Sequence, residues 1–130
     1  MKQTTLANAE LAVMDVLWQS DEPVTARRIR EKLYPDADKS QHGTVQRLLQ
    51  RLEDKGYVRR DRSLSVHLFS AAISRQTYAG QQLETLADKL TEGSFAPLIT
   101  HLVEKKKISR EEIKRIRAIL NGKGEEGGKK

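Results

Sequence analysis

Residues 41–69 read QHGTVQRLLQRLEDKGYVRRDRSLSVHLF, and within this stretch a helical pattern gives way to a strand pattern. Four apolar residues recur at the i, i+3, i+4, i+7 spacing, which places them on one buried face of a helix that starts near Ser40 or Gln41. These residues are Val45, Leu48, Leu49 and Leu52. Gly56 ends the helix, because glycine readily adopts the left-handed backbone that follows a last turn. Residues 57–69 then predict a β-hairpin, since two β-prone stretches flank a polar turn.

Two shorter helices and a brief strand are predicted before this stretch. The first helix covers residues 8–19 with Asn8 as its N-cap, and the second covers residues 26–33 with Thr25 as its N-cap. Val24, which lies between them, predicts a short strand. Three short helices followed by a hairpin is the element order of a winged helix-turn-helix, in which the third helix fits the major groove of DNA and the hairpin is the wing.

The chain beyond the hairpin shows helical patterns only. Ser109 and Glu112 form a capping box ahead of the last of these helices. The predicted fold class is therefore mainly α, with a winged-helix DNA-binding domain over residues 1–72 and an α-helical dimerisation domain over residues 73–121. Residues 122–130 contain no apolar side chain and are predicted to be a disordered tail.

The helical half carries more apolar side chains than three helices detached from the first half can bury alone. A second copy of the chain is the simplest cover, so we expect a homodimer. The side chains expected at its interface are Leu83, Leu86, Leu90, Phe95, Leu98, Leu102 and Ile116.

Composition narrows the possible functions. The net charge of +6 suggests an anionic partner, and nucleic acid is the usual one. The absence of cysteine excludes disulfides, thiolate metal sites and a cysteine nucleophile. No apolar run of about 18 residues occurs, and the N-terminus lacks the pattern of a signal peptide, so we expect a cytoplasmic protein without membrane insertion.

The charge gathers where the predicted architecture would meet double-stranded DNA. Residues 39–67 contain seven lysines and arginines against three acids, a local charge of +4. On the third helix, the side opposite the apolar stripe carries arginine and glutamine, which can pair with guanine and adenine, and the free amides at its start favour phosphate. The wing adds three more arginines. The residues expected to contact DNA are Ser40, Gln41, His42, Gly43, Thr44, Gln46, Arg47, Gln50, Arg51, Arg59, Arg60 and Arg62.

No pattern in the chain indicates catalysis. His42, His67 and His101 fall in different predicted elements and have no partners at metal-ligand spacing. A glycine-rich phosphate loop, a nucleophile elbow and the HExxH pattern are all absent from the sequence. We therefore expect a protein that is not an enzyme and that needs neither a metal nor another cofactor.

Three regions of the sequence resemble the penicillinase repressor family, which includes the methicillin-resistance repressor and copper-responsive relatives. Residues 6–18, LANAELAVMDVLW, look like the opening of that family, and residues 44–56, TVQRLLQRLEDKG, look like its recognition helix. Residues 74–78 and 96–103 look like its dimerisation segment. The resemblance extends over residues 6–121.

The resemblance implies a homodimer that binds a palindromic operator and blocks transcription. In the antibiotic-sensing members, a membrane-bound sensor protease triggers cleavage within the dimerisation domain, which would fall at His101–Leu102 in this chain. That pair departs from the Asn–Phe pair typical of those repressors. The copper-responsive branch uses C-terminal cysteines, so the absence of cysteine argues against copper sensing.

Two other functions are compatible with a winged helix. A protein-interaction module within a larger assembly should present an apolar patch on its third helix, whereas this sequence presents Gln46, Arg47 and Gln50. A protein that coats nucleic acid without sequence preference should carry more aromatic stacking groups than the 5% found here.

Overall fold

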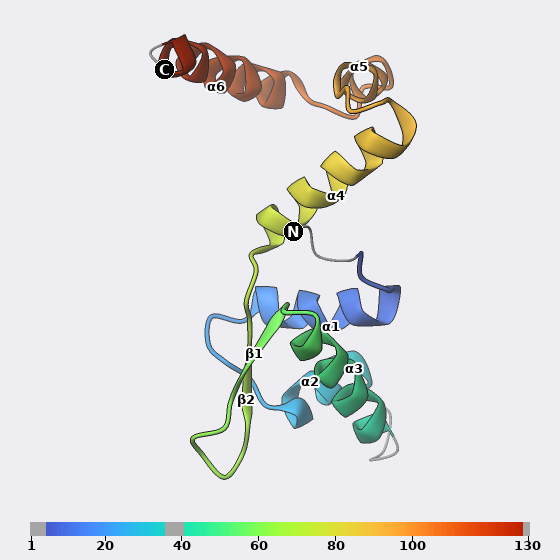
Figure 1. Ribbon diagram of the computed structural model, residues 1–130, viewed down its shortest axis with the longest axis vertical. Coiled ribbons are helices and arrows are strands. Elements are labelled where there is room, and N and C mark those ends of the chain that lie inside the picture. Colours follow the sequence, from blue (N-terminus) through green and yellow to red (C-terminus); the bar gives the residue numbers. More distant parts are fainter. Residues whose placement is uncertain (1–4, 36–40, 129–130) are drawn as a thin grey trace. The chain divides into compact units, whose positions relative to one another are not determined.

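The computed structural model describes residues 5–35 and 41–128, and the chain divides into two units, Met1–Leu83 and Glu84–Lys130. Three helices and a two-stranded antiparallel sheet make up most of the first unit (Figure 1). They are α1 (Asn8–Gln19), α2 (Ala26–Leu33), α3 (His42–Asp54), β1 (Val58–Asp61) and β2 (Leu68–Ala71). This order confirms the predicted winged helix-turn-helix.

The helix ends follow local hydrogen bonds. Thr25 Oγ1 accepts from the Arg28 N–H at 3.1 Å and caps α2, as the sequence predicts. Gly56 has a φ of 85°, so the glycine after α3 adopts the left-handed backbone that was expected. The N-cap of α1 is Ala7 rather than Asn8, because the Glu10 carboxylate accepts from the Ala7 N–H at 2.9 Å and leaves the side chain of Asn8 no capping role.

The hairpin runs to Ala71, two residues beyond the predicted range of 57–69, and a third segment joins it. β1 and β2 pair four residues each, from Val58 opposite Ala71 to Asp61 opposite Leu68. Val24 forms a single bridge with Phe69, with two backbone hydrogen bonds of 2.7 and 2.9 Å. The loop at residues 62–67 lies beyond the paired strands and forms the tip of the wing (Figure 1).

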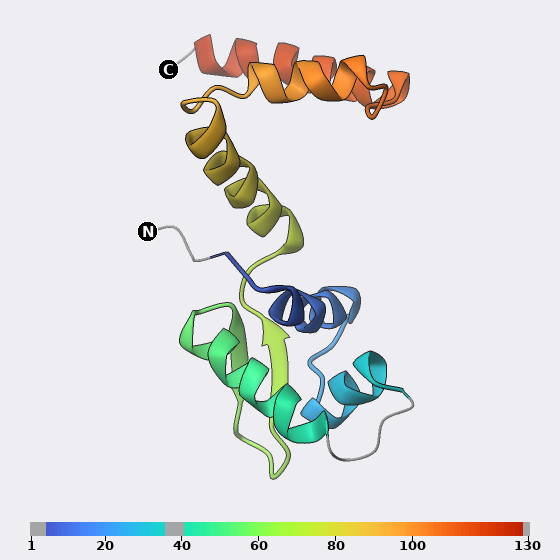
Figure 2. The same ribbon diagram turned by 90° about the vertical axis from the view of Figure 1, so that its right-hand side faces the viewer.

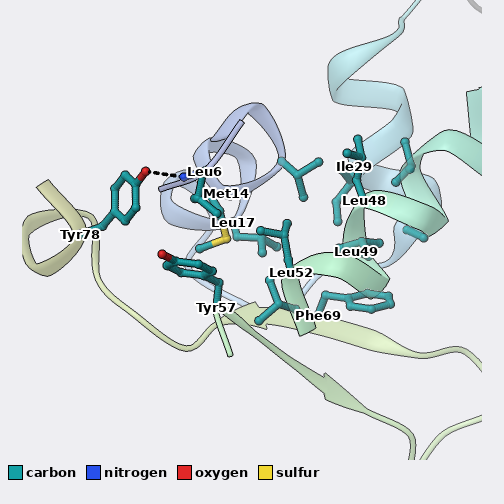
Figure 3. Close-up of a cluster of buried hydrophobic side chains, with 14 residues drawn as sticks. Leu6, Met14, Leu17, Ile29, Leu48, Leu49, Leu52, Tyr57, Phe69 and Tyr78 are labelled. Carbon is teal, nitrogen blue, oxygen red and sulfur yellow. Dashed lines mark hydrogen bonds between the residues drawn. The ribbon is translucent and has the colours of Figure 1, made fainter. Parts of the chain in front are cut away.

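One apolar core holds the first unit together (Figure 3). The predicted stripe of α3 is buried within it, against α1, α2 and the sheet. Tyr57 and Tyr78 meet edge to face at 5.8 Å between ring centroids, and the Tyr78 hydroxyl accepts from the Leu6 N–H at 2.9 Å (Figure 3). Because Tyr78 belongs to this core, the first unit extends to Leu83, beyond the domain border predicted at residue 72.

The second unit is entirely helical in the described residues. It contains the later part of α4 (Arg75–Leu90), then α5 (Ala96–Glu104) and α6 (Arg110–Gly128) (Figure 2). The predicted capping box is confirmed: Ser109 Oγ accepts from the Glu112 N–H at 3.1 Å, and the Glu112 carboxylate accepts from the Ser109 N–H at 2.9 Å. The helical backbone of α6 runs on to Gly128, whereas the sequence predicts disorder from residue 122.

A partly buried ion pair ties the start of α1 to the end of α3. Lys55 Nζ donates to both oxygens of Glu10, at 2.8 and 3.0 Å, and the Glu10 side chain is 3% exposed. Burial alone would raise the pKa of Glu10. Hydrogen bonds from Lys55 and the Ala7 N–H, together with the charges of Lys55 and Arg51, outweigh it and hold that pKa below the usual value of 4.5.

Replacing Glu10 with glutamine tests this ion pair. Glu10→Gln should lower the free energy of unfolding by about 1–3 kcal/mol near neutral pH, because Lys55 loses its charged partner. The folded-state pKa lies below the unfolded one, so the contribution of ionised Glu10 is complete above pH 4.5 and is lost as the pH falls through the folded pKa. Urea unfolding at about pH 7 and about pH 3 should therefore show the difference shrinking in acid.

Glu31→Gln is the matched control, since Glu31 forms an exposed pair with Arg27 at 3.3 Å. It should change stability by less than about 0.5 kcal/mol at either pH. Equal effects of the two substitutions would contradict a special role for the Glu10–Lys55 pair.

Candidate nucleic-acid interface

The side of α3 opposite the core presents polar side chains to solvent. Its exposed residues are Gly43, Gln46, Arg47, Gln50 and Arg51, while Gln41, His42 and Thr44 are half-buried at its start. With no apolar side chain among them, this face offers hydrogen-bond donors and acceptors at the spacing of successive helical turns. A helix of this kind fits the major groove, where base edges present complementary groups.

Weak hydrogen bonds along the helix orient several of these side chains. Gln46 lies 3.0 Å from His42 Nε2, and Arg47 donates to Thr44 Oγ1 at 3.4 Å. The Gln50 amide donates to Asp54 at 2.9 Å. All three contacts are exposed to solvent, so partners on DNA can replace them at little cost. These contacts hold the long side chains close to the helix when no partner is bound.

The three arginines of the wing lie in different environments. Arg59 is exposed on β1. Arg60 is largely covered, with 12% of its side chain exposed; its guanidinium lies over the Phe69 ring at 4.8 Å and its Nε is 3.2 Å from Glu53. Arg62 is 55% exposed and donates to both oxygens of Glu53, at 2.9 and 3.2 Å.

Glu53 thus connects α3 with the wing through two arginines. Arg60 also donates to Gln50 Oε1 at 3.4 Å, so its guanidinium bridges two side chains of α3. Arg60, which the sequence analysis expected to contact DNA together with Arg59 and Arg62, lies against α3 and Phe69 in the structure. Sequence spacing could not reveal this, because residues 53 and 60 meet only when the hairpin folds back along the helix.

The turn of the wing is ordered by its own hydrogen bonds. The Ser63 N–H donates to the Asp61 carboxylate at 2.9 Å. Hydrogen bonds from the Ser63 side chain and backbone lower the pKa of Asp61. Beyond the turn, Leu64 and Val66 are exposed apolar side chains that the sequence analysis did not select.

Ser40 lies outside the described residues, so its predicted contact with DNA has no structural counterpart here. Residues of α2 that the sequence analysis passed over lie on the same side as the wing, since Thr25, Arg27 and Arg30 line a cleft with His42 and His67. The run of arginines in Ala26–Leu33 was the available signal. The sequence analysis assigned no functional role to these arginines.

The helices that follow the wing carry a second surface, which is apolar. Six of the seven residues predicted at a dimer interface are exposed, and Leu98 is half-buried. Further exposed apolar side chains extend this surface; they are Ile99, Val103, Ile119 and Leu120. Exposed apolar side chains in this number are characteristic of helices that bind another protein.

The described residues give little support for a metal site or a membrane-spanning helix. Within residues 5–35 and 41–128, no three His, Asp or Glu side chains gather closely enough to hold a metal ion. No helix in the described part of the chain is long and apolar enough to cross a membrane.

The chain is similar to several known proteins. The family model described as penicillinase repressor matches residues 6–122. The methicillin resistance regulatory protein MecI of Staphylococcus aureus is 27% identical over 122 residues, covering 94% of this chain and 98% of MecI. The transcriptional regulator BlaI of Mycobacterium tuberculosis is 35% identical over 105 residues, covering 80% of this chain and 75% of BlaI. A solved structure of a Lactococcus lactis ZitR variant aligns over 97% of this chain and 78% of its own, with a TM-score of 0.45 and 19% identity.

The environments of the wing arginines predict different effects on stability. Arg60→Ala should lower the free energy of unfolding by about 1–2 kcal/mol, because it removes the cation–π contact with Phe69 and leaves Glu53 with one partner. Arg62→Ala should change it by less than about 0.5 kcal/mol, because its ion pair is exposed. Urea unfolding of both variants measures this. A larger loss for Arg62→Ala would contradict the assignment of Arg60 as the joint between wing and helix.

Proposed function

The chain belongs to the penicillinase repressor family, and from that membership we propose that two copies of it bind a palindromic DNA operator and block transcription. The family consists of DNA-binding transcriptional repressors, which are not enzymes. For this chain we propose an operator contact, a dimer and a means of release. The exposed polar side of α3 is the observation that supports the proposed operator contact.

On that side, Arg47 and Gln50 are one helical turn apart and point away from the buried stripe. An arginine there can donate two hydrogen bonds to guanine, and Gln46 or Gln50 can pair with adenine. A winged helix used as a protein-interaction module would expose apolar side chains at these positions, so the polar face favours DNA.

The wing contributes in two ways under this proposal. Arg59 and Arg62 are exposed enough to reach phosphate groups, with Arg62 exchanging its exposed pair with Glu53 for a phosphate. Arg60 acts indirectly, because its contacts with Glu53, Gln50 and Phe69 fix the direction in which the wing leaves α3. The wing then supplies affinity for any sequence, while α3 supplies the choice of sequence.

The exposed apolar residues of α4, α5 and α6 support a homodimer. Leaving side chains such as Leu90 and Leu120 exposed at 68% and 64% is unfavourable in water, and a second copy of the same surface would cover them. Two linked winged helices would bind two half-sites about one helical turn, or a multiple of it, apart. Their combined affinity would exceed that of one by a large factor, because binding of the second is intramolecular.

Proteolysis within this region would release the operator by separating the two copies. His101 and Leu102 are both exposed, and their peptide bond lies inside the nine-residue helix α5. A protease binds its substrate in extended form, so α5 has to unwind before cleavage at this bond. A membrane-bound sensor protease would be the partner in that step.

Arg47→Ala tests the contact of α3 with DNA. If Arg47 makes a bidentate contact with a base, its loss should weaken operator binding by about 1–3 kcal/mol, while binding to random DNA changes much less. Gel shifts at one fixed salt concentration measure both affinities. The operator is first identified by sequencing the DNA fragments that copurify with the protein. Unchanged operator affinity would contradict the proposed reading role of α3.

Leu102→Asp tests the dimer. Placing a charge in the apolar surface should give a monomer whose first unit remains folded and whose operator affinity falls by more than about tenfold. Thr100→Asp is the matched control, because it adds the same charge to the opposite side of α5 and should leave a dimer. Sedimentation and operator binding measure both variants. A Leu102→Asp protein that stays dimeric, or a monomer that binds as tightly as the parent, would overturn the proposal.

A further inference from the structure

A cleft of about 740 Å³ opens between α2, the start of α3 and the wing. Its volume is within the range of about 300–1,000 Å³ that small-molecule sites occupy, and is larger than a lone inorganic anion requires. All of its lining residues belong to the first unit of the chain.

The lining of the cleft is positively charged. Among the described residues, three arginines and two histidines line it, and no described aspartate or glutamate does. Arg27 and Arg60 each pair with a glutamate outside the lining, at 3.3 and 3.2 Å. The guanidinium of Arg30, by contrast, makes no hydrogen bond or ion pair with any residue in the described ranges. Within the described part of the chain, the cleft therefore presents one cation, Arg30, whose guanidinium is not engaged by another side chain.

Two further features favour an anion. α2 and α3 both begin at the wall of the cleft, and their N-terminal amides add partial positive charge. Nδ1 of His42 is screened from solvent and has no hydrogen-bond partner among the described residues, although a buried polar atom ordinarily has one. Val66 and Phe69 give the cleft an apolar side beside these polar groups.

We propose that this cleft binds a phosphate group attached to an organic body about the size of a nucleotide. The guanidinium of Arg30 matches the planar, multiple acceptors of a phosphate, and the apolar side accommodates the attached body. A phosphate of this kind can come from a free phosphorylated molecule or from the DNA backbone, the second source resting on the proposed function. A free ligand would occupy the space between wing and α3 and would therefore compete with DNA.

The first arm of the test contains no DNA. Adenosine monophosphate is titrated into the full-length protein by calorimetry, with adenosine as the probe that lacks the phosphate. Arg30→Gln should weaken binding of adenosine monophosphate by about tenfold or more, whereas Arg28→Gln should leave it unchanged, because Arg28 is on the same helix but does not line the cleft. Ser65→Glu, at an exposed residue of the lining, should abolish binding by charge repulsion without disturbing the core.

The second arm measures binding to DNA as a function of salt. If the phosphate belongs to the DNA backbone, Arg30→Gln should reduce the slope of log affinity against log salt by about 0.9, and Arg28→Gln should not. Loss of nucleotide binding in the first arm identifies a free ligand, and a changed slope in the second identifies the backbone.

If neither arm responds to Arg30→Gln and Ser65→Glu, or if Arg28→Gln has equal effects, the cleft is not a phosphate site. Because Arg47 does not line the cleft, failure of the operator contact and failure of the cleft proposal give different results.

Discussion

Burial of the apolar stripe of α3 is the constraint on which the rest of the first unit depends. Val45, Leu48, Leu49 and Leu52 pack against α1, α2 and the sheet, and this packing fixes the rotation of α3 about its own axis. Arg47 and Gln50 lie on the side of α3 opposite the stripe. The contacts that bury the stripe therefore also turn these two side chains outward. Stability and the candidate function are thus set by a single feature, since loss of the stripe would leave no defined polar face.

Two arginines of this unit, Arg60 and Arg62, pair with the same glutamate but differ in how far they are buried. Glu53 pairs with both Arg60 and Arg62, which ties the wing to α3 and offsets one of their two positive charges. Exposed pairs such as Arg62 with Glu53 are weak in water, so a phosphate can displace them. A mostly buried guanidinium such as that of Arg60 exchanges partners less readily, because its desolvation has already occurred. Under the proposed function, arginine therefore serves recognition at Arg62 and architecture at Arg60.

The two units differ in how they bury apolar surface. In the first, the side chains of three helices, the hairpin and Tyr78 close a core around Tyr57 and Met14. In the second, Ala87 is fully buried, but most large apolar side chains of α4, α5 and α6 stay exposed. Under the proposed function, a second copy covers these side chains and stabilises this unit, so assembly and release would act through it.

The sequence by itself determined the element order, the bounds of α1 and α2, the glycine after α3 and the capping box at Ser109, because helix periodicity and capping depend on residues close together in the chain. It also determined which side of α3 is polar. Only the tertiary structure decided that Arg60 packs on α3, that Tyr78 belongs to the first unit and that α2 and the wing enclose a charged cleft. Each of these depends on contacts between residues distant in sequence, such as Leu6 with Tyr78. A local pattern cannot encode those contacts, because they form only when the hairpin and α4 pack against the helices.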